Sequence, residues 1–183
     1  MIDKKLYIKN CWINLYKPSG ITSSSAAFKI RKSLTNYFQS TGIMSKNERL
    51  SVGHLGTLDP MAEGVIPIAI GEASKTIPMH EGGEKTYLFT IKWGEQTDTD
   101  DATGKIINTC KKHPTAAEIT NIIPQFIGNI KQTPSKFSAI HIHGQRAYDL
   151  ARAGQNFEVP TRNIVVKSLS LEKSWSENIE TEQ

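Results

Sequence analysis

GHLGTLDPMAEGVIPIAIGEASK, residues 53–75, joins a glycine-rich loop to a run of apolar residues. The second part, GVIPIAIG, has the length and the apolar content of a strand buried in a core. Asp59 and Pro60 stand just before that strand, and an Asp-Pro pair often starts a helix, with the carboxylate as its cap. The flanking glycines allow close approach to the backbone, and His54 lies in the same loop. A functional role for Asp59 therefore competes with a helix cap.

Composition indicates an ordinary globular protein. The 183 residues are 38% hydrophobic, enough to bury a sizeable core. Cys11 and Cys110 form no CxxC pair, which argues against a disulfide framework or a thiolate metal site. No apolar stretch reaches the roughly 18 residues that span a bilayer, and the first residues do not resemble a signal peptide. We expect a cytoplasmic protein that does not enter membranes.

Charge is distributed unevenly along the chain. The net charge is only +4, but residues 1–54 carry +7, residues 55–110 carry −5, residues 111–171 carry +5 and the last twelve carry −3. Two basic segments that flank an acidic middle suit a polyanionic partner with a carboxylate working between the cations. Simple solvation of charged faces explains the same pattern, so charge alone leaves both interpretations open.

Local patterns predict an alternation of helices and strands. A polar connection is expected at 39–50 and a turn-rich loop with a return strand after 95. Thr115 and Glu118 have the spacing of a capping box, and Gly154 ends a short helix. The predicted helices and strands are a strand at 11–17, a helix at 22–38 with Ala27, Ile30 and Leu34 facing the core, and strands at 64–71, 85–94 and 163–175.

Residues 53–75 closely resemble the catalytic segment of the TruB family of tRNA pseudouridine synthases, GH-x-G-[ST]-LDP-x-A-x-GVLP-x-x-x-GEATK. Three further motifs of the family follow in its order: YKPSGITSS at 16–24, KTYLFTIKWGEQTDTDDATG at 85–104 and QTPSKFSAIHIHGQRAYDLARAG at 132–154. The resemblance covers residues 13 to about 171. Tyr16 and Leu55 depart from the family's usual residues without removing a catalytic group.

The resemblance implies an α+β fold with a mixed, largely antiparallel sheet flanked by helices and a thumb-like insertion at about 126–154. Residues 1–183 would form the N-terminal part of a single catalytic domain. The family's K-G-[TS]-Y-[IV]-R segment does not occur in the chain. We therefore expect the last strands of the catalytic sheet, the active-site arginine and the C-terminal RNA-binding extension to be missing.

The implied reaction is the isomerisation of uridine-55 to pseudouridine in the TΨC arm of tRNA. A carboxylate attacks ribose C1′ or removes a proton from C2′, without a metal or organic cofactor. By resemblance Asp59 is this carboxylate. The target base must leave its stack; His54 would fill the vacated space, and Tyr87 would stack on the flipped base.

Supporting residues also follow from the resemblance. Asp101 matches an aspartate that helps to orient the family's arginine, and His141 stands where the family usually has lysine. His141 and His143 alternate as a metal pair does, but no third ligand accompanies them, so we expect no metal site. The cations expected to contact phosphates or to support the site are Lys17, Lys136, Arg146 and Arg152.

Two functions from different classes remain open at this point. One is a tRNA pseudouridine-55 synthase that acts as a monomer on the TΨC stem-loop. The other is a non-catalytic RNA-binding or tRNA-folding protein that has lost the arginine.

Overall fold

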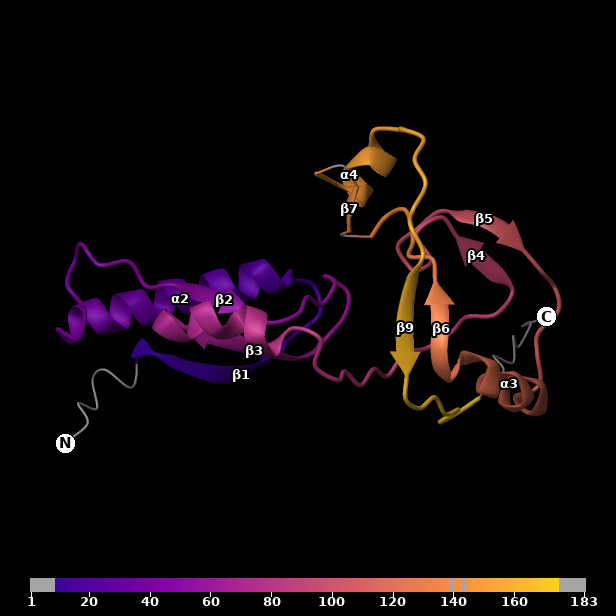
Figure 1. Ribbon diagram of the computed structural model, residues 1–183, viewed down its shortest axis with the longest axis horizontal. Coiled ribbons are helices and arrows are strands. Elements are labelled where there is room, and N and C mark those ends of the chain that lie inside the picture. Colours follow the sequence, from indigo (N-terminus) through magenta and orange to yellow (C-terminus); the bar gives the residue numbers. More distant parts are fainter. Residues whose placement is uncertain (1–8, 139, 143, 175–183) are drawn as a thin grey trace, which may run out of the picture. The chain divides into compact units, whose positions relative to one another are not determined.

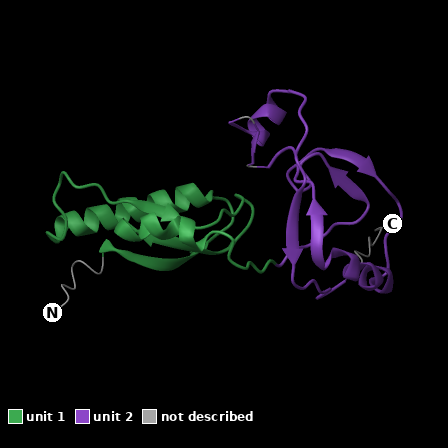
Figure 2. Ribbon diagram, viewed as in Figure 1, with its two compact units in different colours: residues 1–87 green, residues 88–183 purple. Residues whose placement is uncertain are grey.

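The computed structural model describes residues 9–138, 140–142 and 144–174, and its contacts divide the chain into two compact units, residues 1–87 and 88–183 (Figure 2). Both units combine helices with antiparallel strands, which confirms the α+β class. The described strands form four small sheets in place of the one sheet expected. Within the described ranges, no helix is long and apolar enough to cross a membrane.

Unit 1 is built on a three-stranded antiparallel sheet with the order β1-β3-β2, made of β1 (Cys11–Lys17), β2 (Val52–His54) and β3 (Gly64–Ile70) (Figure 1). The predicted strands at 11–17 and 64–71 are confirmed. The register pairs Lys17 with Gly64 and His54 with Ile68. The 55–63 loop that carries Asp59 therefore joins edge strand β2 to central strand β3.

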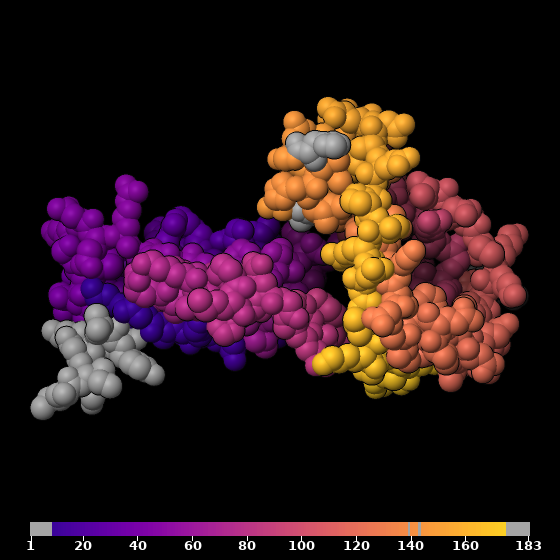
Figure 3. All heavy atoms as spheres, in the orientation of Figure 1, coloured from indigo at the N-terminus to yellow at the C-terminus, as the bar shows by residue number. Residues whose placement is uncertain are grey.

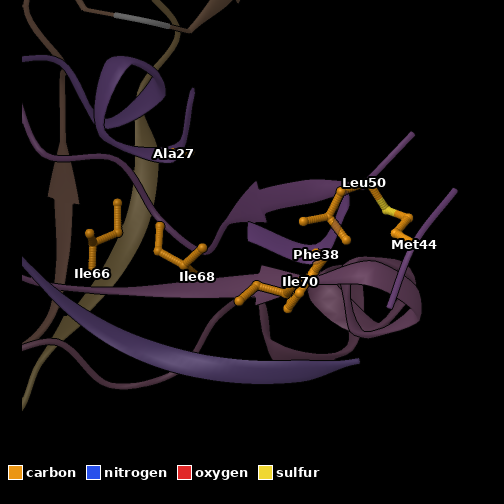
Figure 4. Close-up of a cluster of buried hydrophobic side chains, with 7 residues drawn as sticks. All are labelled: Ala27, Phe38, Met44, Leu50, Ile66, Ile68 and Ile70. Carbon is orange, nitrogen blue, oxygen red and sulfur yellow. The ribbon is translucent and has the colours of Figure 1, made fainter. Parts of the chain in front are cut away.

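Helix α2 (Ser23–Ser40) covers one face of this sheet. It begins where predicted, with Thr22 as its N-cap: the Thr22 Oγ1 accepts a hydrogen bond from the Ser25 N–H at 3.0 Å. Ile30 and Leu34 pack against the core as expected. The core cluster, drawn in Figure 4, consists of Ala27, Phe38, Met44, Leu50, Ile66, Ile68 and Ile70.

The connection at 39–50, which we expected to be a polar surface segment, contributes side chains to the core. Met44 and Leu50 are buried in the core of unit 1, and Ile43 packs against it. These side chains close the end of the layer between α2 and the sheet, where the strands alone leave apolar surface uncovered.

The 3₁₀ segment η1 (Gly71–His80) packs on the face of the sheet opposite α2 and is visible in pink in Figure 3. The Trp12 Nε1–H donates to the Thr76 hydroxyl at 3.3 Å, and the Trp12 ring meets the His80 ring edge-on. A Cβ atom on Gly53 would lie 2.6 Å from Ile77 Cδ1, so a larger residue there would force the end of the Ile77 side chain to move.

The described part of unit 2 consists of three strand pairs and short helices. The hairpin of β4 and β5 confirms the expected return strand. The elements are β4 (Glu95–Thr97), β5 (Ile106–Thr109), α3 (Ala116–Ile122), η2 (Ile123–Phe126), β6 (Gly128–Gln132), β7 (His141–Ile142), β8 (Gln145–Arg146), α4 (Ala147–Arg152) and β9 (Arg162–Val166), with β6 paired to β9 and β7 to β8.

Two predicted helix boundaries in unit 2 are confirmed. The Glu118 N–H donates to the Thr115 hydroxyl at 3.2 Å and the Glu118 carboxylate accepts from the Thr115 N–H at 2.8 Å, the reciprocal bonds of a capping box. Hydrogen bonds from the Thr115 backbone and hydroxyl hold the pKa of Glu118 below its ordinary value. Gly154 follows α4 with a φ of 67°, the left-handed conformation of a helix end. The strand predicted at 163–175 ends at Val166 among the described residues.

The strand predicted at 85–94 is wrong. Residues 83–92 adopt no regular secondary structure, and no described strand pairs with them. Both sets of the alternating side chains are exposed, Tyr87 and Phe89 as well as Leu88 at 89%. Alternation suits a strand, but a strand also needs a neighbour for its backbone N–H and C=O groups.

Candidate active site

Asp59 lies in the loop between β2 and β3 and is exposed. Its backbone C=O accepts a hydrogen bond from the Ala62 N–H at 3.1 Å, which closes a turn. Its carboxylate makes no hydrogen bond or ion pair with any residue that the structure describes. The side chain is therefore not a helix cap, and it is free to meet a ligand.

The turn before α2 and the first residue of the helix hold the backbone of this loop on both sides of Asp59. The Ser23 hydroxyl donates to the Leu58 carbonyl at 3.0 Å and accepts from the Leu58 N–H at 2.9 Å. The Gly20 N–H donates to the Pro60 carbonyl at 2.7 Å. The Ser19 hydroxyl donates to the Met61 carbonyl at 3.0 Å. Asp59 is thus presented by a backbone that is bonded at each adjacent residue, whereas its own side chain is not.

Lys17 anchors the same arrangement from the inside. Its side chain is fully buried, and its ammonium donates to the carbonyls of Pro18 at 3.0 Å, Ile21 at 2.8 Å and Ala62 at 2.5 Å. A lysine ammonium has three donors, and all three are used. Lys17 therefore connects the end of β1, the turn after it and the far side of the Asp59 loop, and it is not available for an RNA phosphate.

Replacing Lys17 by methionine should lower the free energy of unfolding by about 3 kcal/mol, because methionine fills the space but leaves buried carbonyl groups without donors. Urea denaturation followed by far-UV circular dichroism measures this change. Lys75→Met is the matched control, since Lys75 is exposed and paired only with Glu72 at 2.6 Å, and it should cost less than about 1 kcal/mol. Equal losses for the two variants would contradict the anchoring role.

His54 stands at the opposite end of the loop, at the end of β2. Its Nδ1 donates to the Gly56 carbonyl at 2.6 Å, and its Nε2 lies 3.5 Å from the Ser24 hydroxyl at the start of α2. His54 also lines an open hollow of about 320 Å³ with Leu55, Gly56, Thr57, Ile77, Glu81, Gly82 and Lys85. The imidazole is thus oriented by contacts on both of its nitrogens beside a hollow at the edge of the sheet.

Neither Asp59 nor Tyr87 is among the residues that line this hollow. Tyr87 lies two residues beyond Lys85 and is 66% exposed. Unit 1 therefore brings Lys17 and His54 to the loop that carries Asp59, but the described contacts do not join Tyr87 to them.

Asp101 organises its own loop in unit 2. One of its carboxylate oxygens accepts from the hydroxyls of Thr99 and Thr103, at 2.8 and 2.7 Å, and from the Thr103 N–H at 2.8 Å. Partial burial by itself raises the pKa of Asp101, but these bonds and one from the Gly104 backbone outweigh it and hold the pKa below the ordinary value. The observed contacts of Asp101 are those of a loop-forming carboxylate.

The three expected phosphate contacts lie in unit 2 and are exposed. Lys136 stands over the Phe157 ring at 5.7 Å, and Arg152 stands over the Tyr148 ring at 5.5 Å. Arg146 lies on β8, opposite His141 on β7. His143, the other member of the histidine pair, lies outside the described residues. In the described ranges, no three His, Cys, Asp or Glu side chains gather as a metal site.

Ser19, Gly20 and Ser23 were not identified as site residues from the sequence, although they belong to the motif YKPSGITSS. The motif indicated that these residues matter, but it does not reveal which residues they contact in the fold. Ser23 bonds a residue 35 positions away, and such a pairing has no local sequence pattern.

Comparison with known proteins agrees with this arrangement of motifs. Residues 44–182 match the model of the TruB family pseudouridylate synthase N-terminal domain. The chain is 47% identical over 167 residues to tRNA pseudouridine synthase B of Ehrlichia ruminantium and 46% identical over 160 residues to that of Bartonella henselae, covering 91% and 87% of this chain. It spans about half the length of these relatives, 52% and 46%.

Among solved structures, one chain of a Cbf5-Nop10-Gar1 complex aligns with 87% of this chain and 34% of its own length, at 21% identity and a TM-score of 0.48. The family assignment depends on the sequence matches, which cover most of the chain at well above 30% identity. The chain belongs to the TruB family of pseudouridylate synthases.

Proposed function

We propose that this chain is the catalytic part of a tRNA pseudouridine-55 synthase and that Asp59 is its catalytic residue. The observation that carries the proposal is an exposed, unpaired carboxylate on a loop whose backbone is bonded at Leu58, Pro60, Met61 and Ala62. A group that must reach a ribose needs a free charge on a fixed support. Membership of the TruB family supports the same reaction.

The reaction breaks the bond from uracil N1 to ribose C1′ and forms a bond from C5 to C1′. Asp59 attacks C1′ or removes the proton on C2′, and either role needs an ionised carboxylate. After the base turns and rejoins, C5 loses its proton to solvent and N1 gains one. Substrate and product are isomers, so the chemistry balances without an oxidant or a cofactor.

The remaining residues have proposed roles around the flipped nucleotide. Unstacking costs a few kcal/mol, which protein contacts must offset. His54, held at both ring nitrogens, fills the vacated space, and Tyr87 stacks on the base. Asp101 helps to orient the family's active-site arginine, the arginine of the K-G-[TS]-Y-[IV]-R segment. Lys136, Arg146 and Arg152 contact phosphates of the TΨC stem-loop within a thumb-like insertion at about 126–154.

We also propose that residues 1–183 form the N-terminal part of a single catalytic domain. The relatives are about twice as long, and the exposed apolar residues around Leu88 would be buried by pairing with a further strand. Activity should therefore be measured on two proteins: the chain itself, and a fusion of the chain to the remaining C-terminal half of the Ehrlichia ruminantium relative.

Tritium release from a TΨC stem-loop that carries 5-tritiated uridine tests the function, because forming the C5–C1′ bond expels the label. We expect multiple turnovers by the fusion. The control is a stem-loop with cytidine at the target position and tritiated uridine elsewhere, which should release nothing. Stem-loop binding without release would favour a non-catalytic RNA-binding or tRNA-folding protein.

A further inference from the structure

Helix α2 carries three exposed cations and no acidic residue along its whole length. Lys29, Arg31 and Lys32 lie near the middle of the helix, so they do not compensate the negative end of its dipole. None of the positions three or four residues away holds a carboxylate. Like charges so close together repel one another, and the helix gains nothing from them.

The rest of the described structure does not neutralise these cations. Its ion pairs join Lys9 to Glu48, Lys75 to Glu72 and Lys92 to Glu95. The cations of α2 are therefore not paired with any described carboxylate and are available to a negatively charged partner.

Aromatic and hydroxyl groups accompany the charges. Phe28 is 55% exposed, and the Arg31 guanidinium lies 5.2 Å from the centre of its ring. Ser24 and Ser25 are exposed one turn earlier. Cations beside an aromatic ring are what unpaired or looped RNA binds, with phosphates on the cations and a base stacked on the ring.

This face begins at the candidate active site. Ser24 contacts His54, and Phe28, Arg31 and Lys32 follow it at four, seven and eight residues, along one side of a helix. Eight residues span about 12 Å of helix. A chain of phosphates that leaves a nucleotide bound at His54 can therefore run along the cations.

A membrane surface fits α2 poorly. A helix that lies on a bilayer inserts its apolar face among the lipids. In α2 that face, with Ala27, Ile30, Leu34 and Phe38, packs into the core of unit 1 (Figure 4). Only the charged face remains available, so the partner must be held by charge and stacking.

We propose that the exposed face of α2 binds the RNA backbone that continues from the nucleotide at His54. Arg31 and Lys32 contact phosphates, and Phe28 stacks against a base; Lys29 lies farther round the helix and adds to the positive potential of the surface. This proposal rests on the proposed function, since it extends the same RNA beyond Asp59 and His54.

The test compares stem-loop binding over a range of salt concentrations by the chain and by two triple variants. K29Q/R31Q/K32Q should bind at least about tenfold more weakly at low salt. Its log-log salt slope should be shallower by about 1.4 to 1.8, since the two lost phosphate contacts each remove roughly 0.7 to 0.9. Glutamine preserves helix propensity, and far-UV circular dichroism verifies folding. F28A should weaken binding with little change of slope, because stacking releases no counterions.

The matched control is K75Q/K92Q/K105Q, which removes the same charge from exposed lysines, two of them paired with glutamates. If both triple variants bind as the chain does, the proposal that α2 binds RNA is wrong, while the proposed function stands. If the unaltered chain and the fusion bind no stem-loop, the α2 proposal and the proposed function are both wrong. Binding to phosphatidylserine vesicles that K29Q/R31Q/K32Q loses, with stem-loop binding unchanged, would overturn the proposal in favour of a membrane.

Discussion

Replacing Asp59 by asparagine should reduce tritium release by the fusion more than about 10³-fold, while its affinity for the stem-loop changes less than about threefold. Asparagine has nearly the shape of aspartate but is neither nucleophilic nor basic. The carboxylate of Asp59 makes no hydrogen bond or ion pair with a described residue, so its replacement removes no such bond from the loop. The chemical step should therefore be lost without loss of the fold.

Glu63→Gln is the control for this experiment, because Glu63 is an exposed carboxylate of the same loop. It should retain most of the activity. Turnover by the asparagine variant near that of the parent would exclude Asp59 as the catalytic residue, whatever happened to binding. Weakened binding together with lost turnover would instead indicate that the loop had rearranged, and thermal unfolding would reveal it.

The parts of the fold that the sequence predicts well depend on local patterns. The strand 64–70 is apolar, and from Ile66 to Ile70 its faces are covered by α2 and by η1, whereas Val65 near its start is exposed. The start of α2 follows from the cap at Thr22, and that of α3 from the capping box at Thr115. In each of these cases the residues that determine the structure lie within a few positions of one another.

The failures come from long-range partners. Residues 85–94 have the alternation of a strand, yet no described strand supplies a neighbour. Met44 and Leu50 stand in a polar connection but are buried, because they cover apolar surface at the end of the core of unit 1. Lys17 was expected either to contact phosphates or to support the site, and its buried hydrogen bonds to three carbonyls leave only the supporting role. A sequence pattern does not reveal whether a cation faces solvent or the interior.

Part of the Asp59 site was predicted from the sequence and part of it was not. Its loop and His54 follow from the motif at 53–75. The role of YKPSGITSS is evident only once the fold brings Ser19, Gly20 and Ser23 against the loop. The two motifs are thus halves of one structure: one carries the carboxylate, and the other fixes its backbone.

Ser23→Ala should therefore lower kcat for uridine isomerisation by the fusion about 10- to 100-fold, with KM within about threefold. Ser23 is a positioning residue: its buried hydroxyl satisfies both the N–H and the C=O of Leu58, the residue before Asp59. Alanine leaves both groups without partners, and the loop shifts to find others. A displacement of about 1 Å at the carboxylate is enough for a loss of this size, whereas the surfaces that bind RNA stay in place.

Ser33→Ala serves as the control, because Ser33 is an exposed serine on the same helix. It should leave kcat, KM and the unfolding temperature nearly unchanged. Thermal unfolding separates positioning from global stability: Ser23→Ala should remain folded at the assay temperature, and its kcat should stay low there. Ser23→Thr, which keeps the hydroxyl, should recover part of the lost kcat. If kcat falls only in proportion to the fraction unfolded, or if KM rises instead, Ser23 does not position Asp59 and the loop is held by Lys17, Ser19 and Gly20 alone.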